Sequence, residues 1–216
     1  ATGSSQFEVL SNLVRQPEVD WNRVHGFHLD EYLGIDSNHP ASFCGYLKER
    51  FVQHVSLGSF FHLDGTLAPD LLLQQANNAL RGKSIDLLLC GIGENGHLAF
   101  NDPPADFDSD EPYLIVQLDE ACRRQQVGEG WFDRLESVPV HAISMSIRQM
   151  MKAETVLCSV PDLRKAEAVR NAVEGPVTSM VPASILQGHP NAYLILDSGS
   201  SSLLSAETLT KCELLT

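Results

Sequence analysis

Apolar runs alternate along the chain with stretches in which apolar residues recur at helical spacing, and this order predicts alternating strands and helices. The predicted strands cover residues 21–29, 85–92, 113–118, 140–147, 154–160 and 192–197. The predicted helices cover residues 7–14, 42–55, 68–80, 163–173 and 184–189. Because residues 85–92 show no polar alternation, we expect that strand to be buried on both faces. The pattern predicts a three-layer α/β/α, Rossmann-like fold, with a mostly parallel sheet and helices on both faces.

The length of 216 residues fits a single α/β domain over residues 1–216, because neither a repeat nor a linker divides the chain. The first residues, ATGSSQF, have the character of the turn and helix start that follow a strand. We therefore expect the N-terminal strand of this domain to be missing from the sequence.

The charge of the chain limits its partners. Fifteen lysines and arginines stand against 28 aspartates and glutamates, for a net charge of −13. This inventory excludes the broad basic surface that nucleic acid requires and disfavours anionic membranes. No apolar run approaches the roughly 20 residues of a membrane-spanning helix. We expect a small-molecule partner, with no nucleic acid and no membrane, and the sequence is compatible with a monomer or a homo-oligomer.

The five cysteines stand singly in the sequence, without the paired spacing of a zinc or redox site. The histidines likewise show no metal-ligand spacing, so we predict no metal site. An odd number of scattered cysteines is typical of a reducing compartment, and we expect a cytoplasmic protein.

Three polar segments follow predicted strands or open a helix, where ligands bind in open α/β sheets: ATGSS, HLDEY and GIGENGHLAFNDP. In the first, hydroxyl side chains and backbone N–H groups suit a phosphate, or the segment is an ordinary helix N-cap. Its residues are Thr2, Gly3, Ser4 and Ser5.

The other two segments carry candidate acid/base groups. Asp30 follows a strand, where a carboxylate can act as a general base or cap the next turn. At most one of the adjacent residues Asp30 and Glu31 is expected to face a site. His97, flanked by Asn95 and Asp102, has the composition of an oriented proton-transfer group. A polar loop with a satisfied histidine is the alternative.

These segments, together with RKAEAV and PVTSMVPASILQGHP, resemble the glucosamine-6-phosphate deaminase (isomerase) family, which belongs to a larger group that includes 6-phosphogluconolactonases. The resemblance covers nearly the whole chain, and its most specific part is GENGHLAFNDP. It implies conversion of glucosamine 6-phosphate and water to fructose 6-phosphate and ammonia by general acid/base catalysis, with no metal and no organic cofactor.

The resemblance also implies roles for single residues. Asp30 matches the base that moves a proton from C2 to C1, and His97 matches the histidine that assists ring opening. Asp102 matches its carboxylate partner, which is commonly Glu in the family, and Asn95 stands where some members carry Asp. Thr2, Gly3, Ser4 and Ser5 match the phosphate loop, and Lys165 matches a lysine that contacts the phosphate. Arg123 or Arg124 is a candidate second phosphate ligand.

Two other functions compete with this one. In a 6-phosphogluconolactonase, His97 would activate water against an ester carbonyl, but the lactonases typically continue after the histidine with a different sequence. A sugar-phosphate-binding protein without turnover is compatible with Asn95, Asp102 and the missing strand.

Overall fold

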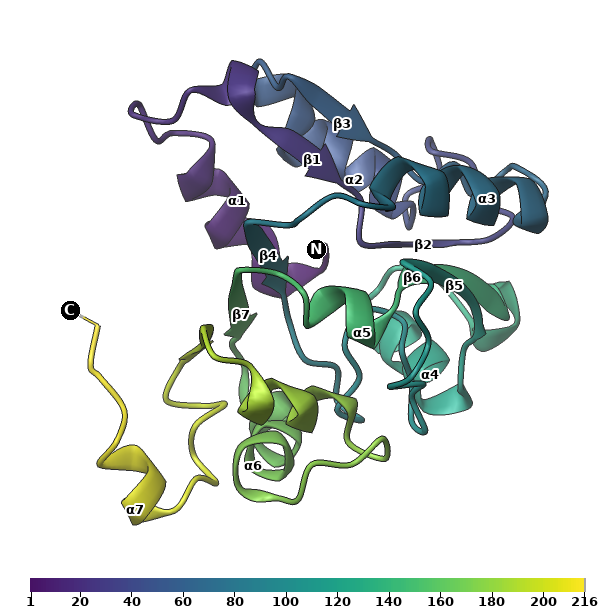
Figure 1. The fold of residues 1–216 in the computed structure, drawn as a ribbon. Coiled ribbons are helices and arrows are strands. Elements are labelled where there is room, and N and C mark those ends of the chain that lie inside the picture. The colour runs from purple at the N-terminus through teal and green to yellow at the C-terminus, as the bar shows by residue number, and fades with distance from the viewer. Residues whose placement is uncertain (216) are drawn as a thin grey trace.

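The computed structural model describes residues 1–215 and contains most of the predicted helices (Figure 1). The main helices are α1 (Phe7–Leu13), α2 (Phe43–Arg50), α3 (Pro69–Leu80) and α6 (Ala166–Glu174). A 3-10 helix over Pro182–Gly188 stands where the sequence predicts a helix at 184–189. Helices α1 and α3 agree with their predicted ranges to within one residue. Helix α2 ends five residues before its predicted end and α6 begins three residues after its predicted start, because residues 52–54 and 163–165 form 3-10 turns.

Within residues 1–215, eight short strands form the sheets, and most of their pairings are parallel. They are β1 (His25–Phe27), β2 (Asp30–Tyr32), β3 (Ser59–Phe61), β4 (Leu87–Cys90), β5 (Tyr113–Gln117), β6 (His141–Met145), β7 (Thr155–Val160) and β8 (Ala192–Leu196). Strands β4, β7 and β8 form one parallel sheet, and β1 pairs with β3 in another. Helices lie on both sides of these strands, so the predicted α/β class and layered arrangement are confirmed.

The third sheet, β2–β6–β5, is antiparallel, which the sequence pattern did not indicate. Strand β2 is only three residues long and reads Asp-Glu-Tyr, so it has no apolar run to reveal it. The predicted strand at 21–29 is too long, because residues 21–23 form a 3-10 turn and only β1 is extended. Three helices were also missed: α4 (Glu120–Gly128), α5 (Ile147–Met150) and α7 (Ala206–Leu209).

The sheets surround a large apolar core, and a cavity lies between two of the strands. The main cluster of buried side chains draws on residues from Leu29 to Leu204. This cavity has a volume of about 850 Å³ and is lined by residues of β1 and β4 and by Ala1. Strands β1 and β4 therefore do not pair with each other in this structure. Among residues 1–215, the helices are all too short or too polar to cross a bilayer.

Glu31 shows how the two adjacent carboxylates of HLDEY divide their roles. Its side chain is buried and accepts hydrogen bonds from Cys44 N at 2.6 Å, Ser42 Oγ at 2.9 Å and Phe43 N at 3.2 Å. Ser42 itself caps α2 by accepting from Gly45 N. Glu31 thus satisfies free N–H groups at the start of α2, where the helix dipole also favours a negative charge. Asp30 points elsewhere, as the alternation of a strand requires.

Candidate active site

A cavity of about 360 Å³ lies at the carboxyl ends of the parallel strands β4 and β7. Its floor includes Gly91 and Gly93, just after β4, and Ser159 and Val160 at the end of β7. Open α/β sheets bind ligands at this edge. The cavity brings together most of the residues singled out in the sequence, namely Thr2, Gly3, Ser4, Ser5, Asp30, His97 and Lys165. Asn95 and Asp102 do not line it but contact His97 from behind.

The N-terminal segment meets the cavity through an uncapped helix start. Gly3 has φ of +89°, which favours glycine, and it precedes a 3-10 turn (Ser4–Gln6) that continues into α1. No side chain caps this turn, so the interpretation of the segment as an ordinary N-cap is not supported. Tyr46 donates a hydrogen bond to Gly3 O at 3.0 Å, and Gln6 donates to Cys90 O at 3.2 Å. The segment is therefore fixed to α2 and β4, with hydroxyl and N–H groups available to an anion.

Asp30 lies at the start of β2 and lines the cavity, although only 5% of its surface is exposed. Burial raises the pKa of its carboxyl group to about 6, while the neighbouring His97 acts in the opposite direction. A carboxyl group with a pKa near neutrality can both accept and return a proton at physiological pH. Because Asp30 lines the cavity, its carboxyl group is within reach of a ligand bound there.

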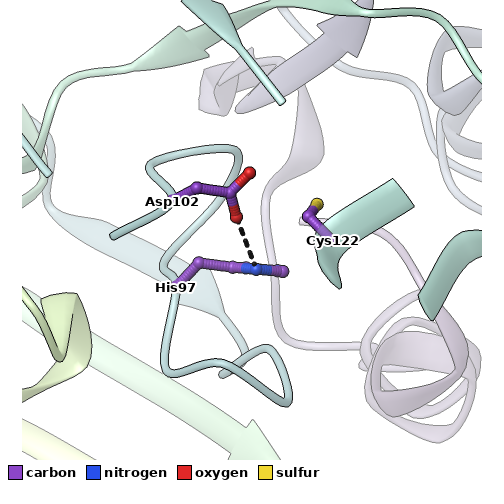
Figure 2. A group of neighbouring side chains, drawn as sticks. All are labelled: His97, Asp102 and Cys122. Atoms are coloured by element: carbon purple, nitrogen blue, oxygen red, sulfur yellow. Dashed lines mark ion pairs between the residues drawn. The ribbon is translucent and has the colours of Figure 1, made fainter. Parts of the chain in front are cut away.

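His97 is held from one side by a carboxylate (Figure 2). Its Nδ1 lies 3.1 Å from Asp102 Oδ1, an ion-pair distance, although the N–H direction is not linear enough for a hydrogen bond. The ring lies directly over Gly93, where a Cβ atom would overlap it. Because Asp102 approaches Nδ1, the other ring nitrogen, Nε2, is the one left to act on a ligand.

Asp102 connects the histidine loop to helix α4. Its Oδ2 accepts a hydrogen bond from Asp119 N at 2.9 Å, and its Oδ1 accepts one from Asn95 Nδ2 at 3.2 Å. Asn95 also donates to Asp119 Oδ2 and accepts from His97 N. Burial acts to raise the pKa of Asp102, but His97 and these donors outweigh it and hold the pKa below its ordinary value. The carboxylate therefore stays ionised and orients the ring.

The cluster of His97, Asp102 and Cys122 offers donor atoms that all lie within 4.8 Å of one another (Figure 2). Nitrogen, oxygen and sulfur donors of this kind suit zinc. However, both oxygens of Asp102 already accept hydrogen bonds from Asn95 and Asp119. The hydrogen-bond network accounts for the position of the carboxylate without an ion.

Two cations reach the cavity from the segment before α6. Lys165 is half-buried, and burial lowers the pKa of its amine, while Glu129 and Glu94 act to raise it. Arg164, which the sequence reading did not single out, also lines the cavity and pairs with Asp162 at 2.9 Å. Together they supply positive charge opposite Thr2 and Gly3.

Arg123 and Arg124, the candidates for a second phosphate-binding residue, lie outside the cavity. Arg123 donates to the carbonyl oxygens of Leu135 and Val138, and Arg124 pairs with Glu120 on the exposed face of α4. Neither residue lines the cavity. The expectation for Arg123 or Arg124 is therefore wrong, because α4 turns both side chains away from the ligand space.

One wall of the cavity was missed entirely in the sequence. It consists of residues at the end of α4 and just beyond it, Gln125, Gln126, Glu129 and Trp131. The helix sequence EACRRQQVG contains few apolar residues, so helical periodicity could not reveal it. The signal that was present is Asp119, an N-cap residue whose side chain accepts from Cys122 N.

Replacing Gly93 by alanine should displace the His97 ring, because the new Cβ atom would occupy the space of the imidazole. We expect a shift of the His97 Cε1–H signal in NMR spectra, assigned by its loss in His97→Gln, and retention of the folded state by circular dichroism. Gly188→Ala is the control, since a Cβ atom there meets open space. An unmoved His97 signal in Gly93→Ala would contradict this packing.

Comparison with known proteins places this geometry in a family. Residues 1–194 match the family described as glucosamine-6-phosphate isomerases/6-phosphogluconolactonase. A similar protein from Exiguobacterium sibiricum, named glucosamine-6-phosphate deaminase, is 38% identical over 208 residues, which are 96% of this chain and 81% of that protein.

Solved structures agree on the fold. A structure described as a monomeric glucosamine-6-phosphate deaminase superposes with a TM-score of 0.84 at 29% identity and covers 94% of this chain and 85% of that one. The 6-phosphogluconolactonase of Trypanosoma brucei has a TM-score of 0.74 at 18% identity, covering 95% of this chain and 84% of that one. The second similarity concerns the fold alone.

Proposed function

The chain belongs to the glucosamine-6-phosphate isomerase/6-phosphogluconolactonase family, and we propose that it converts glucosamine 6-phosphate and water to fructose 6-phosphate and ammonia. The observation that carries the proposal is the single cavity that joins an uncapped helix start, a buried carboxyl group, an oriented histidine and two cations. These groups come from segments far apart in the sequence. The reaction needs each of them at one sugar phosphate.

The phosphate end of the site is formed by the N-terminal turn and the segment before α6. Backbone N–H groups after Gly3 and the hydroxyls of Thr2, Ser4 and Ser5 donate to phosphate oxygens, and Lys165 neutralises the charge. Arg164 adds a second cation at the rim. Binding at this remote group holds the sugar in register for reaction at C1 and C2.

Proton transfer is assigned to Asp30. After the sugar ring opens, the ionised carboxylate removes the proton from C2 of the aldehyde form while O1 takes up a proton from water, and the product is an enolamine with a hydroxyl on C1. The same group then delivers the proton to C1, which leaves an iminium ion at C2. Water adds to the iminium carbon, and ammonia leaves as the ketone forms and a proton returns to solvent. Burial of Asp30 favours both steps, because its pKa of about 6 lies close to neutrality.

His97 is assigned to ring opening. Its free Nε2 moves a proton between the ring oxygen and the C1 hydroxyl, while the ionised Asp102 stabilises the imidazolium form. Asn95 acts as a positioning residue, since it contacts Asp102 and the His97 backbone but not the cavity. Asp102 is shorter than the glutamate common at this position, and in this chain it still reaches His97.

The lactonase alternative would use His97 to activate water and would give Asp30 no proton to carry between carbon atoms. The buried Asp30 therefore favours the deaminase.

A cytoplasmic location is part of the proposal, and it is supported by the five cysteines, all of which are free thiols. The partner is a small sugar phosphate.

We expect the protein to release ammonia from glucosamine 6-phosphate and Asp30→Asn to lose roughly 10² to 10⁴-fold in kcat, because the amide cannot accept the C2 proton. Enzyme-coupled ammonia detection measures both proteins, beside a lactone-hydrolysis assay with 6-phosphogluconolactone. Asp36→Asn is the control, since Asp36 is exposed and lies outside the cavity. Lactone hydrolysis without ammonia release would overturn the proposal in favour of the lactonase.

The rate should depend on pH through Asp30. Only the ionised carboxylate accepts the C2 proton, so kcat/KM should rise tenfold per pH unit up to about pH 6 and level off above it. The measurement is a pH–rate profile, with circular dichroism at each pH to show that the protein stays folded. A profile that falls as the pH rises through about 6 would contradict the role of Asp30 as a base.

A further inference from the structure

Helix α4 presents one buried amide to the cavity. Gln126 lines the cavity, and only 5% of its surface is exposed. Its neighbour Gln125 is committed to the protein, because its Oε1 accepts from Glu94 N and its Nε2 donates to Glu129 Oε1. Gln126 is held differently, and this difference leaves one of its atoms for a ligand.

The carbonyl end of the Gln126 amide is anchored by Tyr32. The Tyr32 hydroxyl donates to Gln126 Oε1 at 2.7 Å. Tyr32 is fully buried, and its ring packs against Phe43, Phe100 and Phe132 at centroid distances of 4.8 to 5.4 Å. This anchor fixes the plane of the amide. Within residues 1–215, Gln126 Nε2 makes no hydrogen bond to another group, so both its hydrogens remain for the cavity.

The helix that carries Gln126 is fixed at both ends. At its start, Asp119 is bonded to Asp102 and Asn95, the residues behind His97. At its end, Trp131 N donates to Gln126 O at 3.0 Å, and Gly130 has φ of +82°. This glycine-terminated helix end leaves the backbone little freedom. The amide is therefore a preorganised donor, which is what discrimination between similar ligands requires.

The proposed substrate carries hydroxyl groups that the Gln126 amide could bind. In the proposed reaction the phosphate lies at Thr2 to Ser5 and Lys165, and C1 and C2 lie at Asp30 and His97. The hydroxyls on C3 and C4 must then occupy the space between the two ends, within the same cavity that Gln126 lines. A neutral amide donor suits a hydroxyl oxygen, whereas a charged side chain would compete with Lys165 or Asp30.

Resting on the proposed function, we infer that Gln126 is a specificity-determining residue, whose Nε2 donates to the C3 or C4 hydroxyl oxygen of the amino-sugar phosphate. Tyr32 acts as its positioning residue. An epimer at the recognised carbon moves its hydroxyl away and leaves the buried donor unpaired, which lowers the rate with that epimer.

The test compares kcat/KM for glucosamine 6-phosphate with its C3 and C4 epimers, allosamine and galactosamine 6-phosphate. In Gln126→Met, which keeps the side-chain length and removes the donor, we expect the preference over one epimer to fall roughly tenfold or more. Tyr32→Phe should lower the same preference by a smaller factor, and the double variant should add little to Gln126→Met. Gln53→Met is the control, because Gln53 is exposed on a distant helix.

A merely structural role would lower kcat/KM for the three sugars by one common factor, and this result in Gln126→Met would overturn the inference. If that variant fails to fold, Tyr32→Phe decides alone: a selective loss for one epimer supports the inference, and unchanged ratios contradict it. A parent protein that releases no ammonia from any of the sugars would overturn the proposed function and the inference together. Ammonia release by the parent with unchanged ratios in both variants would overturn the inference alone.

Discussion

The carboxylate of Asp102 is the contact on which the rest of the site depends. It is one group with three neighbours: the His97 ring, the Asn95 amide and the backbone N–H of Asp119. The first two belong to the loop after β4, and the third begins α4. Because a buried carboxylate must be paired, these segments cannot separate without leaving it uncompensated. One charge thus sets the direction of the His97 ring and the position of the cavity wall formed by α4.

The site separates its charges along the cavity. Arg164, Lys165 and the uncapped turn after Gly3 supply positive charge at the proposed phosphate end, although the chain carries a net charge of −13. The proton-transfer end is instead governed by burial, which raises the pKa of Asp30 to about 6. A local anion site needs only a few oriented donors, so a negative net charge is compatible with binding a small phosphate. The two adjacent carboxylates Asp30 and Glu31 have different environments, since Asp30 lines the cavity and Glu31 accepts hydrogen bonds at the start of α2.

The parts of the fold with a strong pattern could be predicted from the sequence, and the parts without one could not. Strand β4 is a continuous apolar run and β7 is mostly apolar, and the carboxyl end of β4 leads directly into the loop of His97. Strand β2 is too short and too polar to show an apolar pattern, and its antiparallel pairing with β6 joins residues far apart in the sequence. Helix α4 lacks an apolar stripe, so the sequence pattern gives no sign that Gln126 lines a cavity. In the sequence alone, Arg164 has the pattern of an exposed helix charge, and only the fold shows that it reaches the cavity. Such residues are held by tertiary contacts, which a single sequence does not reveal.

In the proposed complex, one sugar phosphate spans this cavity, with its phosphate at the N-terminal turn and C1 and C2 between Asp30 and His97. A crystal structure with an open-chain amino-alditol phosphate, which lacks the carbonyl group needed for reaction, tests it most directly. We expect phosphate oxygens within hydrogen-bond distance of Ser4, Ser5 and Lys165, and the Asp30 carboxylate beside C1 and C2. A phosphate bound at any other place, or C1 and C2 remote from Asp30, would contradict the account.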